Sequence, residues 1–222
     1  MEQMQLLECS AQVVEIISIE DDKTVIILDQ TVFYPQGGGQ PYDTGVIQTE
    51  TTIFDVLEVR FVDGKVNHIG KYQAGHFVVG DTVSCVVEKE RRVLNTRLHS
   101  AGHLLDMGLK ELNILWKPGK GYHFPQGPYV EYLAEDHVIG ESLKTDLENK
   151  LAEIIGRNIE TEIKFIEEEI VNGKPARIVY YGNFGVPCGG THCKNLSEVK
   201  KIAIKKIKKE KDAIRISYNL AN

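Results

Sequence analysis

The amino-acid sequence predicts an α+β fold in which a small N-terminal β-barrel is followed by a mixed domain of helices and strands. Three observations carry this prediction. Short β-branched segments with frequent turn signals fill residues 1–90, helical spacing begins near Glu88, and an alternating pair of strands closes the sequence. We therefore expect a barrel domain over residues 1–90 and an α+β domain over residues 91–222.

The expected barrel strands are short runs rich in β-branched residues. They cover residues 13–17, 24–28, 54–62 and 65–69, and a further strand is expected after Gly80-Asp81. Asp63-Gly64 is a two-residue turn signal that joins two of these runs into a hairpin. Several short strands at such spacing are typical of a small barrel.

The second half of the sequence changes character. Apolar residues recur at helical spacing from Glu88 to Leu112, and a second helix is expected from Glu141 to Ile155, ended by Gly156. Strands are then expected at residues 160–165, 176–181, 201–207 and 213–218, with a turn at Asn172-Gly173. This mixture predicts the α+β domain.

The composition is that of an ordinary globular protein, with 42% hydrophobic and 26% charged residues. None of its apolar runs reaches the roughly 18 residues that a membrane span needs. Its N-terminal segment has neither a basic region nor an apolar stretch of secretory length. The four cysteines are too sparse for a disulfide scaffold in 222 residues. We expect a cytoplasmic protein.

Charge is distributed unevenly along the sequence. From Val199 onward the sequence has seven lysines and one arginine but only two acidic residues, Glu210 and Asp212. This segment therefore carries a net charge of +6, whereas the whole chain carries −6. The remainder therefore carries −12. This asymmetry indicates either a basic patch for a polyanionic partner or a solvated hairpin with its lysines outside.

Two pairs of metal-ligating residues, each spaced by four, are the strongest functional signal. They are His99 with His103 in HSAGH, and Cys188 with His192 in CGGTH. Residues i and i+4 share one face of a helix, so His99 and His103 can point at one ion. Three imidazoles and one thiolate suit Zn²⁺. Read singly, each pair could be a chance occurrence; together they predict a shared metal site.

Glycines lie within both pairs of metal-ligating residues and in a separate loop. Gly102 lies inside the expected helix, where glycine costs about 1 kcal/mol relative to alanine. The two glycines of CGGTH would let Cys188 and His192 converge and expose backbone N–H groups to an oxyanion. Gly37, Gly38 and Gly39 precede Gln40 in a loop that could approach a substrate or phosphate closely, although it lacks the P-loop spacing. A plain barrel loop is the alternative.

Four segments taken together resemble the editing domain of alanyl-tRNA synthetases, and more closely the free-standing AlaX editing proteins. They are FYPQGGGQPYDTG (33–45), RLHSAGHLL (97–105), KGYHFPQGPYVEY (120–132) and PCGGTH (187–192). The resemblance implies a medium-length, trans-acting, ATP-independent deacylase for Ser-tRNA(Ala), in some cases also Gly-tRNA(Ala), that serves translation fidelity. It also implies a barrel followed by a zinc-containing editing domain. Threonyl-tRNA synthetases carry related dyads, but the glycine-rich loop argues against that branch.

The resemblance implies the metal ligands, and the residues themselves suggest roles for the others. Zinc would be held by His99, His103, Cys188 and His192, and would either orient the serine or activate water. We expect Gln40 beside the scissile ester and Thr191 at the seryl hydroxyl. Substrate binding is assigned to the glycines and to lysines that would contact tRNA phosphates: Gly37, Gly38, Gly39, Lys205 and Lys208, with Lys200, Lys201, Lys206 and Lys209 as further candidates.

An alanine pocket cannot strongly reject serine, because serine only adds a hydroxyl. A second site that hydrogen-bonds this hydroxyl spares the alanyl ester, which would leave its polar groups unpaired. Two other classes stay open, a zinc-stabilised RNA-binding module without chemistry and a metal hydrolase for another ester or amide. His123 borders the site in one interpretation and is a packed or surface histidine in the other.

Overall fold

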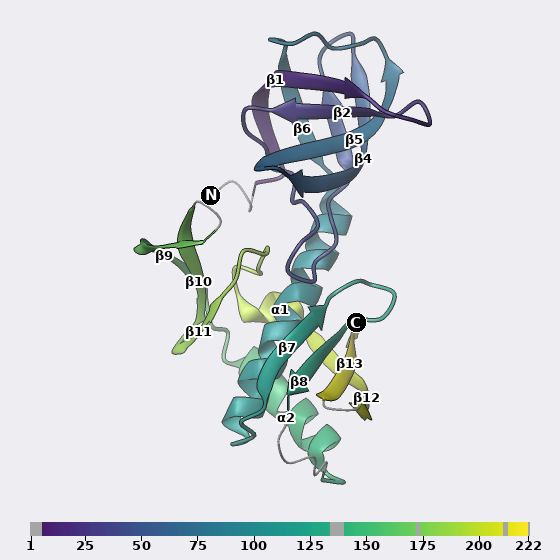
Figure 1. Cartoon of the computed structure of the whole chain (residues 1–222). Coiled ribbons are helices and arrows are strands. Elements are labelled where there is room, and N and C mark those ends of the chain that lie inside the picture. The colour runs from purple at the N-terminus through teal and green to yellow at the C-terminus, as the bar shows by residue number, and fades with distance from the viewer. Residues whose placement is uncertain (1–5, 134–139, 172–173, 211–212, 222) are drawn as a thin grey trace. The chain divides into compact units, whose positions relative to one another are not determined.

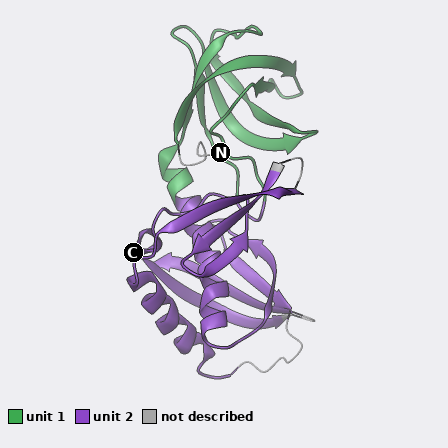
Figure 2. Ribbon diagram, turned by 90° about the vertical axis from the view of Figure 1, so that its left-hand side faces the viewer, with its two compact units in different colours: residues 1–37, 41–93 green, residues 38–40, 94–222 purple. Residues whose placement is uncertain are grey.

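A computed structural model describes residues 6–133, 140–171, 174–210 and 213–221. The chain forms two compact units, residues 1–37 with 41–93 and residues 38–40 with 94–222 (Figure 2). As limits of independent domains, residues 1–90 and 91–222 stay a prediction. The tripeptide 38–40 belongs to the second unit although both its flanks belong to the first.

The first unit is a closed antiparallel barrel, which confirms the predicted fold class (Figure 1). Its strand order is β1-β2-β5-β4-β3-β6. The strands are β1 (Glu8–Ser18), β2 (Thr24–Leu28), β3 (Gly45–Gln48), β4 (Ile53–Val62), β5 (Lys65–Ala74) and β6 (Thr82–Val87). The four-residue strand β3 was not expected, because Gly-Val-Ile-Gln is too short to show alternation.

Alternation along the strands fills the barrel interior. Phe54, Val56 and Val59 of β4 are fully buried, and the shift from even to odd positions coincides with a β-bulge between Val56 and Glu58. The core also takes Ala11, Val13, Ile26, Ile47, Val83 and Cys85. Closure of the barrel lets neighbouring strands hydrogen-bond all round, and the inward face of each strand buries its apolar residues.

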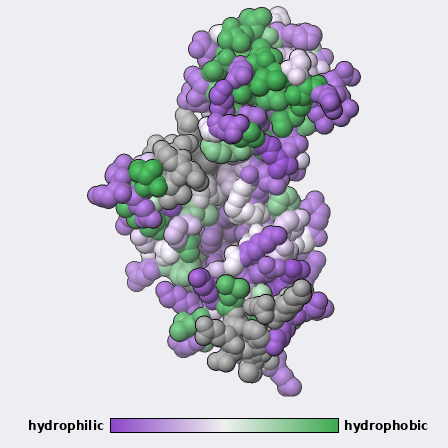
Figure 3. All heavy atoms as spheres, in the orientation of Figure 1, coloured by the Kyte–Doolittle hydropathy of each residue, from purple (hydrophilic) through white to green (hydrophobic). Residues whose placement is uncertain are grey.

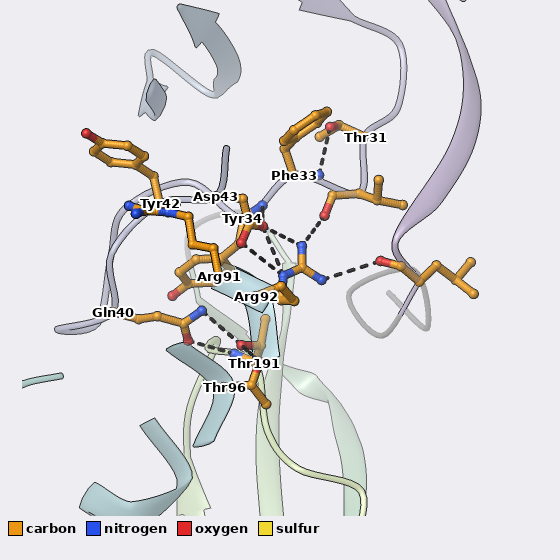
Figure 4. Close-up of polar contacts among 12 residues, drawn as sticks. Thr31, Phe33, Tyr34, Gln40, Tyr42, Asp43, Arg91, Arg92, Thr96 and Thr191 are labelled. Carbon is orange, nitrogen blue, oxygen red and sulfur yellow. Dashed lines mark hydrogen bonds and ion pairs between the residues drawn. The ribbon is translucent and has the colours of Figure 1, made fainter. Parts of the chain in front are cut away.

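A buried ion pair crosses the barrel unit. The Arg92 side chain donates to both carboxylate oxygens of Asp43, from Nε at 3.0 and 3.1 Å and also from Nη2. It also donates to the carbonyl of Val32 at 2.6 Å, and Asp43 accepts from the Tyr34 backbone at 2.6 Å (Figure 4). Both charges are therefore paired and hydrogen-bonded, which burial requires.

The second unit combines two helices with two small sheets. Its elements are α1 (Lys89–Glu111), β7 (Lys117–Tyr122), β8 (Tyr129–Leu133), α2 (Leu143–Gly156), β9 (Thr161–Val171), β10 (Lys174–Tyr181), β11 (Phe184–Pro187), a 3-10 helix (Leu196–Val199), β12 (Lys201–Glu210) and β13 (Ala213–Ala221). One sheet has the order β12-β13-β8-β7 and the other β11-β10-β9. The first residues of α1 belong to the barrel unit.

Helices α1 and α2 share the core of this unit. Leu104, Leu105 and Leu109 of α1 are fully buried in the same cluster as Leu147 and Leu151 of α2. A Cβ added to Gly108 would lie 2.9 Å from the Leu147 side chain, so this glycine lets the helices approach closely. The expected helices are confirmed within one or two residues.

Three strands of the second unit were not expected. β7 reads Lys-Pro-Gly-Lys-Gly-Tyr and has no apolar alternation, and β11 has only four residues. β8 lies within the resemblance segment 120–132 but was not assigned as a strand. The predicted turn at Asn172-Gly173 lies outside the described residues.

The surface differs between the units. Apolar side chains stay exposed on β1 and β4, among them Ile17, Leu57 and Phe61, and Figure 3 shows apolar residues gathered on the barrel. The visible face of the second unit is mainly hydrophilic (Figure 3). Within the described residues, no helix combines the length and apolarity that crossing a membrane requires.

Replacing Asp43 by alanine should lower the free energy of unfolding of the barrel by about 3–5 kcal/mol, because the Arg92 charge would stay buried without its partner. Hydrogen exchange of the barrel amides measures this loss. Glu15→Ala, which removes an exposed ion pair with Lys65, serves as control and should cost less than about 1 kcal/mol. An Asp43→Ala loss as small as that of the control would contradict the prediction.

Candidate metal centre and its surroundings

The two pairs of metal-ligating residues come together in the second unit. His99 and His103 lie on α1, and Cys188 and His192 lie on the segment that follows β11; their donor atoms all lie within 4.8 Å of one another. The His99 Nε2 atom is 3.1 Å from both His103 Nε2 and Cys188 Sγ. Side chains separated by 85 or more positions in sequence thus form one cluster.

The outer nitrogens of two rings face neighbouring polar groups, one through a hydrogen bond and one at a longer distance. His192 Nδ1 is hydrogen-bonded to the Tyr181 hydroxyl at 2.7 Å, and His192 Nε2 is buried without a partner among the described residues. His103 Nδ1 lies 3.7 Å from Asp106, whose carboxylate accepts from Tyr132 at 2.7 Å. Such outer partners orient metal-binding imidazoles, so the residues present fit a divalent ion such as Zn²⁺.

The electrostatics of the cluster favour the metal-binding form of three donors and the protonated form of His103. Burial, followed by the charge on His103, holds the pKa of His99 and of His192 well below the ordinary value. Burial also opposes charge on His103, but the nearby acidic groups of Asp106 and Cys188 raise its pKa to about 9. Burial opposes charge on Cys188, but its interactions with His103, Gly190 and Arg177 together outweigh burial and lower its pKa. This direction favours the thiolate as a donor, and an ion would displace the His103 proton.

Close packing explains the glycines of the CGGTH segment. A Cβ at Gly190 would lie 2.4 Å from His99 Cε1, so only glycine leaves room for this imidazole. The expected reason was backbone freedom, yet neither Gly189 nor Gly190 has a positive φ. The Arg177 guanidinium, from β10, donates to the carbonyls of Cys188 at 2.5 Å and Gly190 at 3.0 Å and fixes the segment.

Gln40 and Thr191 bind each other reciprocally. The Gln40 amide nitrogen donates to Thr191 Oγ1 at 2.9 Å, and the Thr191 backbone N–H donates to Gln40 Oε1 at 3.0 Å (Figure 4). Thr191 Oγ1 also bonds Thr96 of α1 at 2.7 Å. Gln40 is 0% exposed, and one amide hydrogen and one lone pair remain beyond these bonds. The glutamine thereby links the glycine-rich loop to the residue preceding His192.

His123 is enclosed by three glycines. A Cβ at Gly102 would lie 2.3 Å from its Cε1 atom, one at Gly121 2.6 Å from Nε2, and one at Gly39 3.2 Å from Cδ2. The His123 backbone N–H donates to the Gly39 carbonyl at 2.8 Å, and its ring centroid lies 4.8 Å from that of His99. Burial, followed by the charge on His103, lowers the pKa of His123 to about 3. Of its two interpretations, the one that borders the site agrees with this position.

The remaining expected residues are two lysines of β12 and the glycines that precede Gln40. Lys205 and Lys208 are exposed on β12, where a β-bulge falls between Ile204 and Lys206. Gly38 and Gly39 have φ of 54° and 76° and belong to the second unit, whereas Gly37 belongs to the barrel. Sequence reasoning missed three neighbours of the cluster: Asp106, Arg177 and Tyr181. Only Asp106 had a signal, its i+3 spacing from His103.

Comparisons with known proteins agree with this arrangement. Residues 2–91 match the family described as tRNA synthetases class II (A), and residues 176–216 match the threonyl and alanyl tRNA synthetase second additional domain. The alanyl-tRNA editing protein AlaX-L of Pyrococcus horikoshii is 32% identical over 96% of this chain and 55% of its own length.

Two alanine–tRNA ligases are also similar. That of Clostridioides difficile is 33% identical over 81% of this chain and 22% of its own length, and that of Archaeoglobus fulgidus 30% identical over 94% and 24%. The chain therefore spans about half of the editing protein and about a quarter of either ligase. Fold, donor cluster and these similarities point in one direction: the chain is similar over nearly its whole length to an AlaX-type alanyl-tRNA editing protein, and two of its segments match families of tRNA synthetases.

Proposed function

We propose that this protein is a deacylase that acts in trans on mischarged tRNA(Ala) and hydrolyses mainly the ester of Ser-tRNA(Ala). The similarity to an alanyl-tRNA editing protein supports the reaction class. The observation that carries the proposal is the convergence of four metal-binding side chains next to the reciprocal Gln40–Thr191 pair. Hydrolysis of an aminoacyl ester is downhill and needs no ATP. We expect it to take place in the cytoplasm.

We propose Zn²⁺ as the cofactor, held by His99, His103, Cys188 and His192. The donor set is three nitrogens and one sulfur, and outer partners at Asp106 and Tyr181 orient two of the rings. When bound, the ion would supply positive charge beside the ester. Because all four donors come from the protein, we assign orientation of the ester to the surrounding polar groups.

Those polar groups come from the glycine-rich loop and from Thr191. The remaining amide hydrogen of Gln40 is our candidate to contact the scissile ester. The two hydrogen bonds between Gln40 and Thr191 hold the Gln40 side chain in one rotamer. Thr191 also bonds Thr96, so one hydrogen-bonding position of its hydroxyl remains for a seryl group: a lone pair if Thr191 donates to Thr96, and the proton if it accepts. Gly38 and Gly39 add side-chain-free backbone, and Gly37 completes the loop assigned to substrate binding.

We assign binding of the tRNA backbone to the lysines of β12. Lys205 and Lys208 are exposed on this strand, in the segment whose net charge is +6. Lysines contribute to RNA affinity by releasing counterions from phosphates and carry little sequence information. Other contacts would then distinguish tRNA(Ala) from other tRNAs, and the buried site around the donor cluster would distinguish serine from alanine.

The first test is a panel of substrates. We expect purified protein to deacylate Ser-tRNA(Ala) rapidly while Ala-tRNA(Ala) and Ser-tRNA(Thr) persist, because both the seryl hydroxyl and the tRNA contribute to recognition. Release of labelled amino acid measures the three rates. Binding of all three without turnover would favour an RNA-binding module. Rapid turnover of a small seryl ester without RNA would favour a general hydrolase.

A second prediction separates contact with the ester from support of the loop. Gln40→Ala should lower kcat about 10²–10³-fold, as loss of a donor to a reacting ester does. Thr96→Val removes the other hydrogen bond to Thr191 and is the matched control. We expect it to retain kcat within about tenfold. Equal losses in the two variants would mean that Gln40 acts only by holding Thr191.

The third prediction concerns the metal. Cys188→Ala should abolish deacylation and lower the bound zinc measured by mass spectrometry of the native protein, because the sulfur donor is lost. The control is Cys193→Ala. Cys193 follows His192 in the sequence but is not one of the four donors, so this variant should keep one equivalent of zinc. A Cys188→Ala protein that retains a full equivalent would contradict the assigned donor set.

A further inference from the structure

We propose that one face of the four-stranded sheet binds the unpaired 3′ end of the tRNA, with a base stacked on Phe124 and phosphates held by Lys206 and Lys208. This inference rests on the proposed deacylase function and adds the surface along which the substrate approaches the site. The stacked base belongs to a nucleotide before the esterified one, because the esterified nucleotide itself must enter the buried site.

The sheet β12-β13-β8-β7 (Figure 1) has one face in the core of the second unit and one face outside it. Val130, Ile214 and Ile216 point into that core and are buried. Successive side chains of a strand point to opposite faces, so the residues between these point to the outer face. The strand register places the following side chains on the outer face, each of them exposed or half-buried: Tyr122, Tyr129, Glu131, Arg215, Ser217, Lys206 and Lys208.

Planar side chains on and beside the outer face form a stacked column. Tyr122 and Tyr129 lie directly opposite each other on β7 and β8, with ring centroids 5.2 Å apart and an interplanar angle of 19°. Phe124 stacks with Tyr122 at 4.4 Å and 14°. The Arg215 guanidinium lies 4.2 Å from the centroid of the Tyr129 ring. The column therefore runs across the sheet from Arg215 on β13 to Phe124, just beyond the end of β7.

The three aromatic rings of this column lie outside both apolar cores. Tyr122, Phe124 and Tyr129 are half-buried, and none of them belongs to either core cluster of the described residues, whereas the half-buried Trp116 does. Of the described aromatic rings, only Tyr122 stacks on Phe124, so a further planar group can extend the column at its Phe124 end. Aromatic side chains held in place at a surface are what proteins use to stack unpaired bases.

Two lysines of β12 share the outer face with the column. Lys206 lies opposite Ser217, which in turn lies opposite Tyr129, so these residues form one row across the strands. Lys208 lies opposite Arg215 in the next row. Both lysines are exposed, and their charges suit the phosphates of a strand whose bases lie along the same face.

The register also shows which other charges the outer face carries. Glu131 is an acidic residue of this face, and Arg215 donates to its carboxylate at 2.7 Å. Lys209 lies opposite the buried Ile214 and therefore points to the other side of the sheet, and Lys205 lies at the β-bulge. The structure thus separates Lys206 and Lys208 from the neighbouring lysines of the same basic strand.

The direction of the RNA strand follows from the position of the ester site. Phe124 follows His123, whose backbone N–H donates to the carbonyl of Gly39, the residue before Gln40, at 2.8 Å. The Phe124 end of the column is therefore next to the glycine-rich loop. The lysines of β12 lie at the opposite edge of the sheet, three interstrand spacings or about 14 Å away. The strand crosses the sheet with its 3′ end at β7 and its preceding phosphates at β12.

A short RNA oligonucleotide that ends in CCA tests the stacking site directly. A fluorescent base analogue replaces the cytosine before the terminal adenine, and stacking on an aromatic ring quenches it. We expect quenching by the unaltered protein and by Phe124→Trp. Phe124→Leu keeps an apolar side chain without a ring and should lose the quenching and bind about tenfold more weakly. Phe165→Leu, at an exposed aromatic position of β9, is the matched control and should behave as the unaltered protein.

The salt dependence of binding tests the lysines. The logarithm of the binding constant for the same oligonucleotide falls with the logarithm of the salt concentration, and each phosphate contact with a single strand contributes about 0.7 to the slope. Lys206→Gln and Lys208→Gln should each weaken binding and reduce the slope by this amount. Lys209→Gln removes the same charge from the other side of the sheet and should leave the slope nearly unchanged.

The outcomes separate the RNA surface from the deacylase reaction. A protein that binds and quenches the oligonucleotide but does not deacylate Ser-tRNA(Ala) would support the surface and overturn the proposed function. An active protein whose Phe124→Leu variant binds and quenches as the Phe165→Leu control does would overturn the stacking site. Equal slopes for the Lys206→Gln, Lys208→Gln and Lys209→Gln variants would overturn the assigned face. An active protein that binds no oligonucleotide at low salt would mean that this face serves another class of partner.

Discussion

The contact on which the rest of the second unit depends is that between helix α1 and the segment after β11. It brings His99 to within 3.1 Å of Cys188 Sγ and leaves space for that ring only because residue 190 is a glycine. A helix alone can align two imidazoles, but it cannot supply a thiolate from another part of the chain. The packing of these two segments therefore creates the donor set.

Glycine has the same role at several positions, and that role is space more than flexibility. Gly102, Gly121 and Gly190 each have an imidazole where their Cβ would be, and Gly39, which also lies against His123, adds a positive φ to the close approach. The helix-propensity cost at Gly102 is thereby explained by the ring of His123. Four residues that look like loop or defect signals in the sequence are the inner lining of one site.

The buried ion pair of the barrel and the buried polar groups around the donor cluster differ in how far they are paired. In the barrel, Arg92 and Asp43 satisfy each other and nearby backbone groups, as a structural ion pair must. Around the donor cluster, His192 Nε2 and both amide atoms of Asn95 lack partners among the described residues. Unpaired groups of this kind are uncommon in native interiors, and their concentration near one cluster is what a binding site for an ion and a polar ligand requires.

The sequence by itself determined the elements whose signals are local. Helix α1, the longer barrel strands and the four donor residues follow from spacing and side-chain chemistry, because a helical turn or a strand repeats within a few residues. Strands β3 and β7 were missed because four residues, or a run of lysine and glycine, carry no periodicity. Only the tertiary structure decided that Gln40 meets Thr191, that His123 lies against Gly102, and that Arg177 and Tyr181 support the donor segment. Those pairings join residues from different elements, and the packing of the elements, which no local pattern records, sets which of them touch.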